Sequence, residues 1–143
     1  MHRTLVHIRR LSYLVLFSLL AACGDDKLTL AVIVRTDVVP GVEFVRVDTT
    51  LLESTEPGTA ESTLEQKRLM VGRSTSYGSG ANVATFSNLD ARELVVLVQL
   101  IDARGSVVLE RRTRMTLAND FGLSVVMTRD CSGVQCPSPG GQP

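Results

Sequence analysis

The chain has 143 residues with 15 basic and 15 acidic side chains, so its formal net charge is zero. This length fits a single domain. Both histidines, His2 and His7, lie among the first ten residues, which excludes histidine chemistry from the rest of the chain. Arg3, Arg9 and Arg10 lie in the same N-terminal stretch, and without them 12 basic residues face 15 acidic ones, a net charge of about −3. This charge gives no electrostatic footprint for nucleic acid, so we expect no nucleic-acid partner.

Residues 1–22 have the pattern of a secretory signal peptide. The first ten residues carry three arginines and no acid, and an apolar run follows from Leu11 to Ala22, interrupted by Ser12 and Ser18. The run has about a dozen residues, whereas a membrane-spanning helix needs about 20. Its apolar side chains cover every helical face, which argues against an amphipathic core helix. We expect removal of residues 1–22, which leaves a mature chain with three more acidic than basic residues.

Leu20-Ala21-Ala22-Cys23 resembles the lipobox of bacterial lipoproteins. The resemblance implies that the Cys23 sulfur receives lipid and that cleavage separates Ala22 from Cys23. Buried acyl chains contribute about 0.8 kcal/mol per methylene, and two or more chains anchor a protein stably. The resemblance therefore implies a membrane partner through Cys23 in the bacterial cell envelope. Gly24 stands where the best-known sorting rule places Asp for inner-membrane retention, which favours the outer membrane.

The first part of the mature chain predicts a short tether and two strands. Residues 23–27 form the lipidated tether, and apolar residues then alternate over Leu28–Arg35, as in a half-buried strand. Val39-Pro40-Gly41 predicts a turn, and β-branched residues over Val42–Leu52 predict a second strand. The pair is interpreted as a hairpin or a sheet-to-sheet corner.

The middle of the chain is less regular. Ser54–Glu61 is a predicted loop around Pro57-Gly58. Thr63–Val71 fits a strand, which we favour, although Ser62-Thr63-Leu64-Glu65 also fits a helix capping box. Gly72–Gly80 is rich in Gly and Ser but lacks the Gly-Lys-Ser/Thr of a phosphate-binding loop, so we interpret it as a flexible connection.

The last third predicts four more strands, at Val83–Leu89, Leu94–Ile101, Ser106–Leu117 and Phe121–Thr128. Leu94–Ile101 is a nearly unbroken apolar run, which is typical of a central strand buried on both faces. Arg111 lies on the inward parity of its strand and marks a bulge or a sheet edge. Seven short strands predict an all-β domain over residues 28–130, an antiparallel sandwich.

Residues 84–89 and 95–108 resemble bacterial immunoglobulin-like and carboxypeptidase-regulatory (transthyretin-like) sandwiches. The shared pattern is a short strand ending in Leu89, a turn, an apolar strand, and Asp-x-x-Gly at Asp102–Gly105. Arg92-Glu93-Leu94 replaces the usual Gly-x-Tyr before the apolar strand. The resemblance covers roughly residues 28–130 and implies a fold class without implying a function.

Residues 131–143 form a predicted tail, rich in Pro and Gly and mostly disordered. An exported chain can oxidise Cys131 and Cys136 to a structural disulfide. The alternative is a metal or redox site. Four residues separate the two cysteines, and no histidine or further thiol remains to complete a zinc set, so we favour the disulfide.

The remaining side chains predict no catalytic residue, metal or cofactor. Ser catalysis lacks a His base, and neither Lys27 nor Lys67 stands in a Ser-x-x-Lys arrangement. Paired carboxylates can hydrolyse glycosides, and Asp37 and Glu43 flank the Pro40-Gly41 turn, but solvated acids beside a turn are the simpler interpretation. Calcium-loop spacing is absent around Asp48. We favour a noncatalytic binding or structural module for an envelope protein or a polysaccharide; the alternative is an enzyme that uses carboxylates on a cell-envelope polymer.

Overall fold

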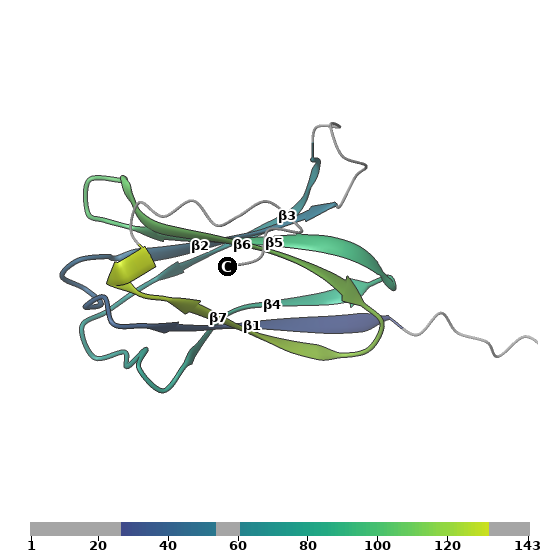
Figure 1. Cartoon of the computed structure of the whole chain (residues 1–143), viewed down its shortest axis with the longest axis horizontal. Helices are drawn as coiled ribbons and strands as arrows, with labels where there is room; N and C mark the ends of the chain where they lie inside the picture. The colour runs from purple at the N-terminus through teal and green to yellow at the C-terminus, as the bar shows by residue number, and fades with distance from the viewer. Residues whose placement is uncertain (1–26, 54–60, 132–143) are drawn as a thin grey trace, which may run out of the picture.

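A computed structural model describes residues 27–53 and 61–131, which form two β-sheets packed face to face (Figure 1). One sheet has three strands in the order β4-β1-β7, and the other has four in the order β3-β2-β5-β6. The all-β sandwich of seven strands is therefore confirmed. The strands are β1 (Leu28–Thr36), β2 (Arg46–Glu53), β3 (Thr63–Met70), β4 (Ala81–Leu89), β5 (Arg92–Ile101), β6 (Val107–Leu117) and β7 (Phe121–Met127).

Four of the five strand pairings are antiparallel, and β1 with β7 is parallel. In an immunoglobulin constant domain the first, second, fifth and fourth strands share one sheet. Here the first two strands lie in different sheets, so the strand order differs from that type. The connection between β1 and β2 is a sheet-to-sheet corner rather than a hairpin.

The core is built mainly from the inward-facing side chains of six strands, all except β3. β5 lies at the centre of its sheet, between β2 and β6, and is buried on both faces over most of its length, as its apolar run predicts. The largest fully buried side chains are those of Phe44, Phe86, Leu30, Leu51, Leu94, Leu100, Leu117 and Met127. Removing such apolar surface from water is the main driving force of folding.

The second strand begins at Arg46, so the predicted start at Val42 is wrong. Residues 37–45 form a looped corner in which the Gly41 amide donates to the Phe44 carbonyl at 2.8 Å. The Glu43 amide donates to the Val39 carbonyl at 2.9 Å. Phe44 nevertheless faces the core, fully buried. An apolar residue that anchors a loop has the same sequence pattern as a strand residue, which explains the error.

The Gly- and Ser-rich segment 72–80 is a loop, as predicted, but its centre is anchored. Tyr77 is buried, and its ring meets that of Phe44 edge-to-face at a centroid distance of 5.4 Å. Such pairs stabilise beyond the area they bury. Burial also raises the pKa of the Tyr77 hydroxyl above its ordinary value. The two loops at this end of the sandwich therefore hold one another in place.

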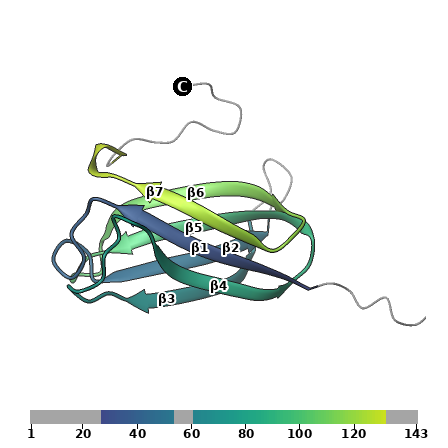
Figure 2. The ribbon, with the colours of Figure 1, turned by 90° about the horizontal axis from the view of Figure 1, so that it is seen from below.

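The segment 63–70 is a strand, and the helix alternative does not form. Lys67 reaches from β3 across the seam between the sheets, where its Nζ donates to the Thr85 carbonyl of β4. The same Nζ lies 5.2 Å from the centre of the Phe86 ring, in cation–π geometry. Lys67 thus joins the two sheets. Figure 2 shows that its strand, β3, and the partner strand, β4, lie on the same side of the sandwich.

Arg111 lies on β6, which is an edge strand of the four-stranded sheet. The one register shift in the β5–β6 ladder lies at Leu100/Ile101, away from the Arg111 pairing with Val98. Of the two predicted explanations for its inward parity, the sheet edge is therefore correct and the bulge is not.

Gly41 and Gly105 provide a matched test of how closely the loops pack. Both have positive φ, +70° and +87°, but a Cβ on Gly41 would lie 2.8 Å from the Arg73 backbone nitrogen, whereas Gly105 has open space. We expect Gly105→Ala to lower the free energy of unfolding by about 1–2 kcal/mol through backbone strain alone. Gly41→Ala adds overpacking, for about 2–4 kcal/mol in total. Urea unfolding of both variants checks this, and equal losses would contradict the packing of the two loops.

Candidate functional site

The outer face of the four-stranded sheet carries a hollow of about 620 Å³. Its floor comes from the outward side chains of the two central strands, and its sides come from the two edge strands. β2 and β5 pair Thr50 with Leu97 there, so a threonine hydroxyl lies within an otherwise apolar floor. The lining residues are Thr50, Leu52, Glu61, Thr63, Gln66, Leu97 and Arg112.

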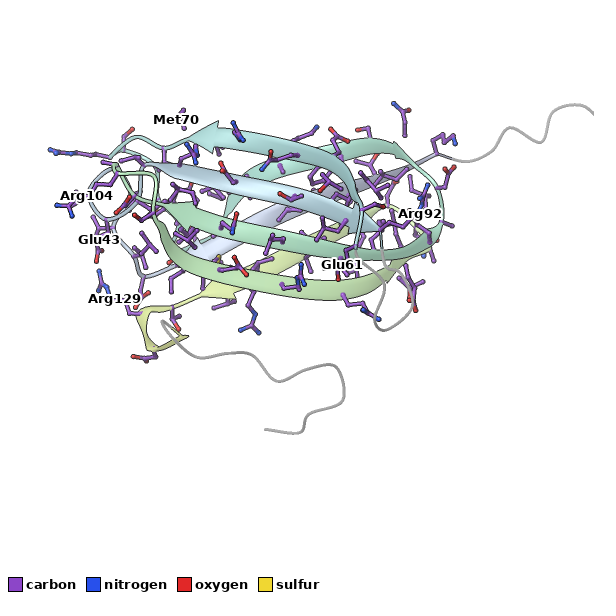
Figure 3. The ribbon with its side chains drawn as sticks, turned by 90° about the horizontal axis from the view of Figure 1, so that it is seen from above. Glu43, Glu61, Met70, Arg92, Arg104 and Arg129 are labelled. Carbon is purple, nitrogen blue, oxygen red and sulfur yellow. The ribbon has the colours of Figure 1, made fainter. Side chains whose placement is uncertain are left out.

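An ion pair joins the two sides of this hollow. Arg112 of β6 lies 2.8 Å from the carboxylate of Glu61, which immediately precedes β3. Because β3 and β6 are opposite edges of the sheet, the pair bridges the width of β2 and β5. Figure 3 shows Glu61 on this face of the four-stranded sheet. On this outer face Leu52 and Val95 point away from the core between the sheets, yet both side chains are buried. The arrangement combines an apolar floor with a polar, charged rim, as ligand and partner sites commonly do.

Beside the hollow, Asp48 is held between two arginines. Its carboxylate lies 2.8 Å from Nε of Arg46 and 3.9 Å from Nε of Arg68, and its side chain is only 7% exposed. The next position across the sheet carries Gln99, which donates to Glu110 at 2.6 Å. The carboxylates of Asp48 and Glu110 are therefore bound to neighbouring side chains, and they stabilise the sheet surface.

Asp37 and Glu43, the acid pair noted in the sequence, both bind Arg129. The Arg129 amide donates to Asp37 at 3.0 Å, and its guanidinium bonds to Glu43. Glu43 also accepts the Val39 amide at 2.6 Å. The hydrogen bond from Arg129 lowers the pKa of Glu43 below its ordinary value, the reverse of what a general acid needs. The pair attaches the short 3-10 helix at Arg129–Cys131 to the 37–43 loop.

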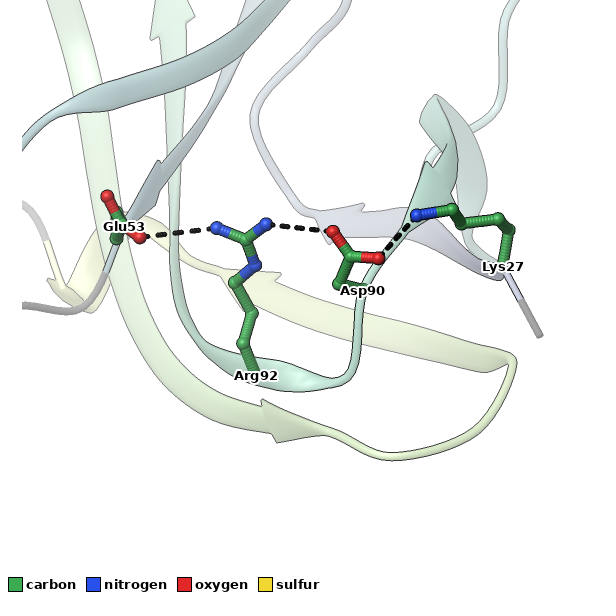
Figure 4. A network of polar contacts seen from close by, with 4 residues as sticks. All are labelled: Lys27, Glu53, Asp90 and Arg92. Atoms are coloured by element: carbon green, nitrogen blue, oxygen red, sulfur yellow. Dashed lines mark hydrogen bonds and ion pairs between the residues drawn. The ribbon is translucent and has the colours of Figure 1, made fainter. Parts of the chain in front are cut away.

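A second network lies at the opposite end, where the chain leaves the predicted tether. Lys27 pairs with Asp90 at 2.5 Å, and Arg92 bridges Asp90 and Glu53 at 3.2 Å each (Figure 4). Lys27 lowers the pKa of Asp90, with a smaller contribution from Arg92. The network joins the start of β1 to the β4–β5 turn and the end of β2, so it fixes the end of the sandwich at which Lys27 lies.

Most of the site residues predicted from the sequence lie outside the part of the chain that the structure describes. Ala22, Cys23 and Cys136 lie outside the described residues, as does the side chain of Cys131, so lipidation, cleavage and the disulfide stay predictions. Within residues 27–53 and 61–131 no three His, Cys, Asp or Glu side chains gather in a way that would hold a metal. In the same ranges no helix is long and apolar enough to cross a membrane.

Sequence reasoning did not find the hollow. Glu61 and Arg112 are far apart in the chain, and only the sheet order brings them together. The available signals were the outward parity of Arg112 and the polar Thr50 inside a strand that is buried almost throughout. The acid-rich pocket that an enzyme acting through carboxylates requires is not formed by these residues, because the hollow brings in one carboxylate, already paired with Arg112.

The Glu43–Arg129 contact makes a pH-dependent attachment. A lowered folded-state pKa stabilises the fold above the unfolded pKa of Glu, and this contribution is lost as the pH falls through the folded value. We expect carboxyl NMR titration to place the pKa of Glu43 below its ordinary value, and Arg129→Gln to raise it toward that value, although the Val39 amide still lowers it. Arg104→Gln, in the β5–β6 turn, is the control and leaves the titration unchanged. An ordinary Glu43 pKa in the wild type would contradict the contact.

Comparison with known proteins adds one finding about the fold. No protein-family model matches the chain, and no curated protein matches it in sequence. The structure is similar to that of an alternative pilotin from the type II secretion system of Vibrio cholerae, with a TM-score of 0.50 and 9% identity. The match covers 72% of this chain and 95% of the pilotin. At that identity the likeness shows a shared fold and no more.

Proposed function

We propose that this chain is a lipid-anchored protein of the bacterial cell envelope whose β-sandwich binds an envelope partner and catalyses no reaction. The observation that carries the proposal is the outer-face hollow, with its apolar floor and the Glu61–Arg112 pair across it. The hollow offers surfaces and hydrogen-bonding groups for a partner, and its one carboxylate, that of Glu61, is already paired with Arg112. The transthyretin-like sandwich class and the anchoring of Cys23 are parts of the same proposal.

Two further points support a protein as the partner over a polysaccharide. A similar solved structure is that of a pilotin from a type II secretion system. The hollow also lacks an exposed aromatic platform, since its described lining contains no Phe or Tyr side chain. In this proposal the lipid holds residue 27 close to the outer membrane, and the hollow faces sideways along the sheet.

The anchor is tested by expressing the full chain with its leader in a Gram-negative host, beside Cys23→Ser. We expect the wild type to fractionate with membranes, to begin at Cys23 and to carry acyl mass, because only the thiol accepts the lipid. Cys23→Ser is expected to lack acyl mass and to lose its membrane association. Cys131→Ser is the matched control and stays lipidated. Identical fractionation and mass additions for the wild type and Cys23→Ser would contradict the anchor.

The hollow is tested by reversing its charge. Arg112→Glu places a carboxylate beside Glu61, so we expect recovery of the partner from detergent-solubilised envelopes to fall about tenfold, as for loss of a charge pair at an interface. Arg104→Glu carries the same charge change at the far end of the sandwich and is expected to recover the partner normally. Co-sedimentation with purified peptidoglycan tests the polysaccharide. No specific protein and no sedimentation would refute a binding role.

A further inference from the structure

The four edge strands of the sandwich differ in how they are protected from pairing with another chain. Free sheet edges are commonly blocked by bulges or by inward-pointing charges. β3 carries Lys67 and β6 carries Arg111 on their inward parity, and the ladder of β4 with β1 contains two register shifts. β7 has no such feature: residues 121–127 contain no charge and no Pro, and the ladder with β1 is regular throughout.

Beside β7 the inner face of β6 is incompletely covered by the three-stranded sheet. The three-stranded sheet faces a four-stranded one, and β6 runs outside β7 along the same long edge (Figure 2). The inward residues in the middle of β6, Arg111, Thr113 and Met115, are only partly buried, whereas Leu109 and Leu117 at its two ends are buried. Within the described residues, β7 pairs only with β1. We call this position, beside β7 and over the inner face of β6, the β7 slot.

The chemistry of the β7 slot indicates what would occupy it. Arg111 pairs with Val98 through the main chain, but its guanidinium forms no ion pair or hydrogen bond with any described residue. A carboxylate stabilises a partly buried guanidinium by accepting two parallel hydrogen bonds from its N–H groups. Phe121, on the inward parity of β7, and Val126, on its outward parity, are about half exposed, at 51% and 53%. A complementary strand therefore combines β-branched or apolar side chains with one acid opposite Arg111.

Neither of the nearest available segments fits that description. Residues 132–143 contain three prolines, which cannot donate to a sheet ladder, and no Asp or Glu. The β7 strand of a second copy likewise contains no acid to meet Arg111. Charge complementarity thus favours a different protein.

We propose that the β7 slot binds an extended strand of a partner protein, which pairs with the main chain of β7 and places an Asp or Glu against Arg111. Strand addition of this kind takes its affinity from main-chain hydrogen bonds and its specificity from alternate side chains. The site is separate from the outer-face hollow, and it does not depend on the lipid anchor.

The test uses the full chain, produced in a bacterial host, and fluorescent seven-residue peptides of alternating Thr and Val. One peptide has Glu at its centre and a second has Lys. We expect the Glu peptide to bind at least about tenfold more tightly by fluorescence anisotropy, because only it pairs with Arg111. A Glu peptide N-methylated at alternate residues cannot form the ladder and is expected to lose binding. Equal binding of the Glu and Lys peptides, or binding of the N-methylated peptide, would overturn the proposal.

Protein variants locate the binding. Arg111→Glu is expected to reverse the peptide preference, whereas Arg114→Glu, on the outer parity of the same strand, keeps it. If Arg111→Glu fails to fold by circular dichroism, Arg111→Gln serves instead and is expected to abolish the preference. Arg112→Glu leaves peptide binding unchanged, which separates this site from the hollow. Peptide binding that appears only after residues 132–143 are removed would show that this segment occupies the β7 slot. Self-association of the chain that competes with the peptide would show that a second copy occupies it. Either result would overturn the choice of a partner protein.

Discussion

The pairing of β2 with β5 is the interaction on which the rest of the structure depends. The two strands are in register from Arg46 with Ile101 to Glu53 with Leu94, and together they supply both faces of the sheet centre. Inward residues such as Leu51 enter the core, and outward ones such as Leu52 form the floor of the hollow. A slip of one residue would exchange these two sets, because successive strand residues point to opposite faces. The core and the candidate site are thus set by the same register.

Much of this architecture could be predicted from local pattern. Alternating apolar residues identify β1, the unbroken run identifies β5, and the turn at Asp102–Gly105 separates β5 from β6, where the Asp102 carboxylate accepts the amides of Arg104 and Ser106. These signals are local because a strand's periodicity and a turn's hydrogen bonds involve neighbouring residues.

What the sequence could not provide is the set of long-range pairings. The assignment of β1 and β2 to different sheets, and the parallel pairing of β1 with β7, depend on contacts between distant segments. Tyr77 looked like part of a flexible loop because its anchoring contact, Phe44, lies more than thirty positions away. The outer-face hollow could not be predicted from the sequence for the same reason, because the Glu61–Arg112 pair joins opposite edges of the sheet. The lipid anchor, in contrast, is a prediction that needs only the four adjacent residues Leu20-Ala21-Ala22-Cys23.

The parallel alignment of β1 and β7 has a mechanical consequence. β1 begins at the end that carries Lys27 and runs toward the far end of the sandwich, and β7 runs the same way to Met127. Tension applied between residue 27 and the segment after β7 would draw the two strands past one another lengthwise. The pairings from Leu30 with Phe121 to Thr36 with Met127 would then bear the load together instead of opening one after another. The sandwich is built to resist a pull in shear along its own long axis.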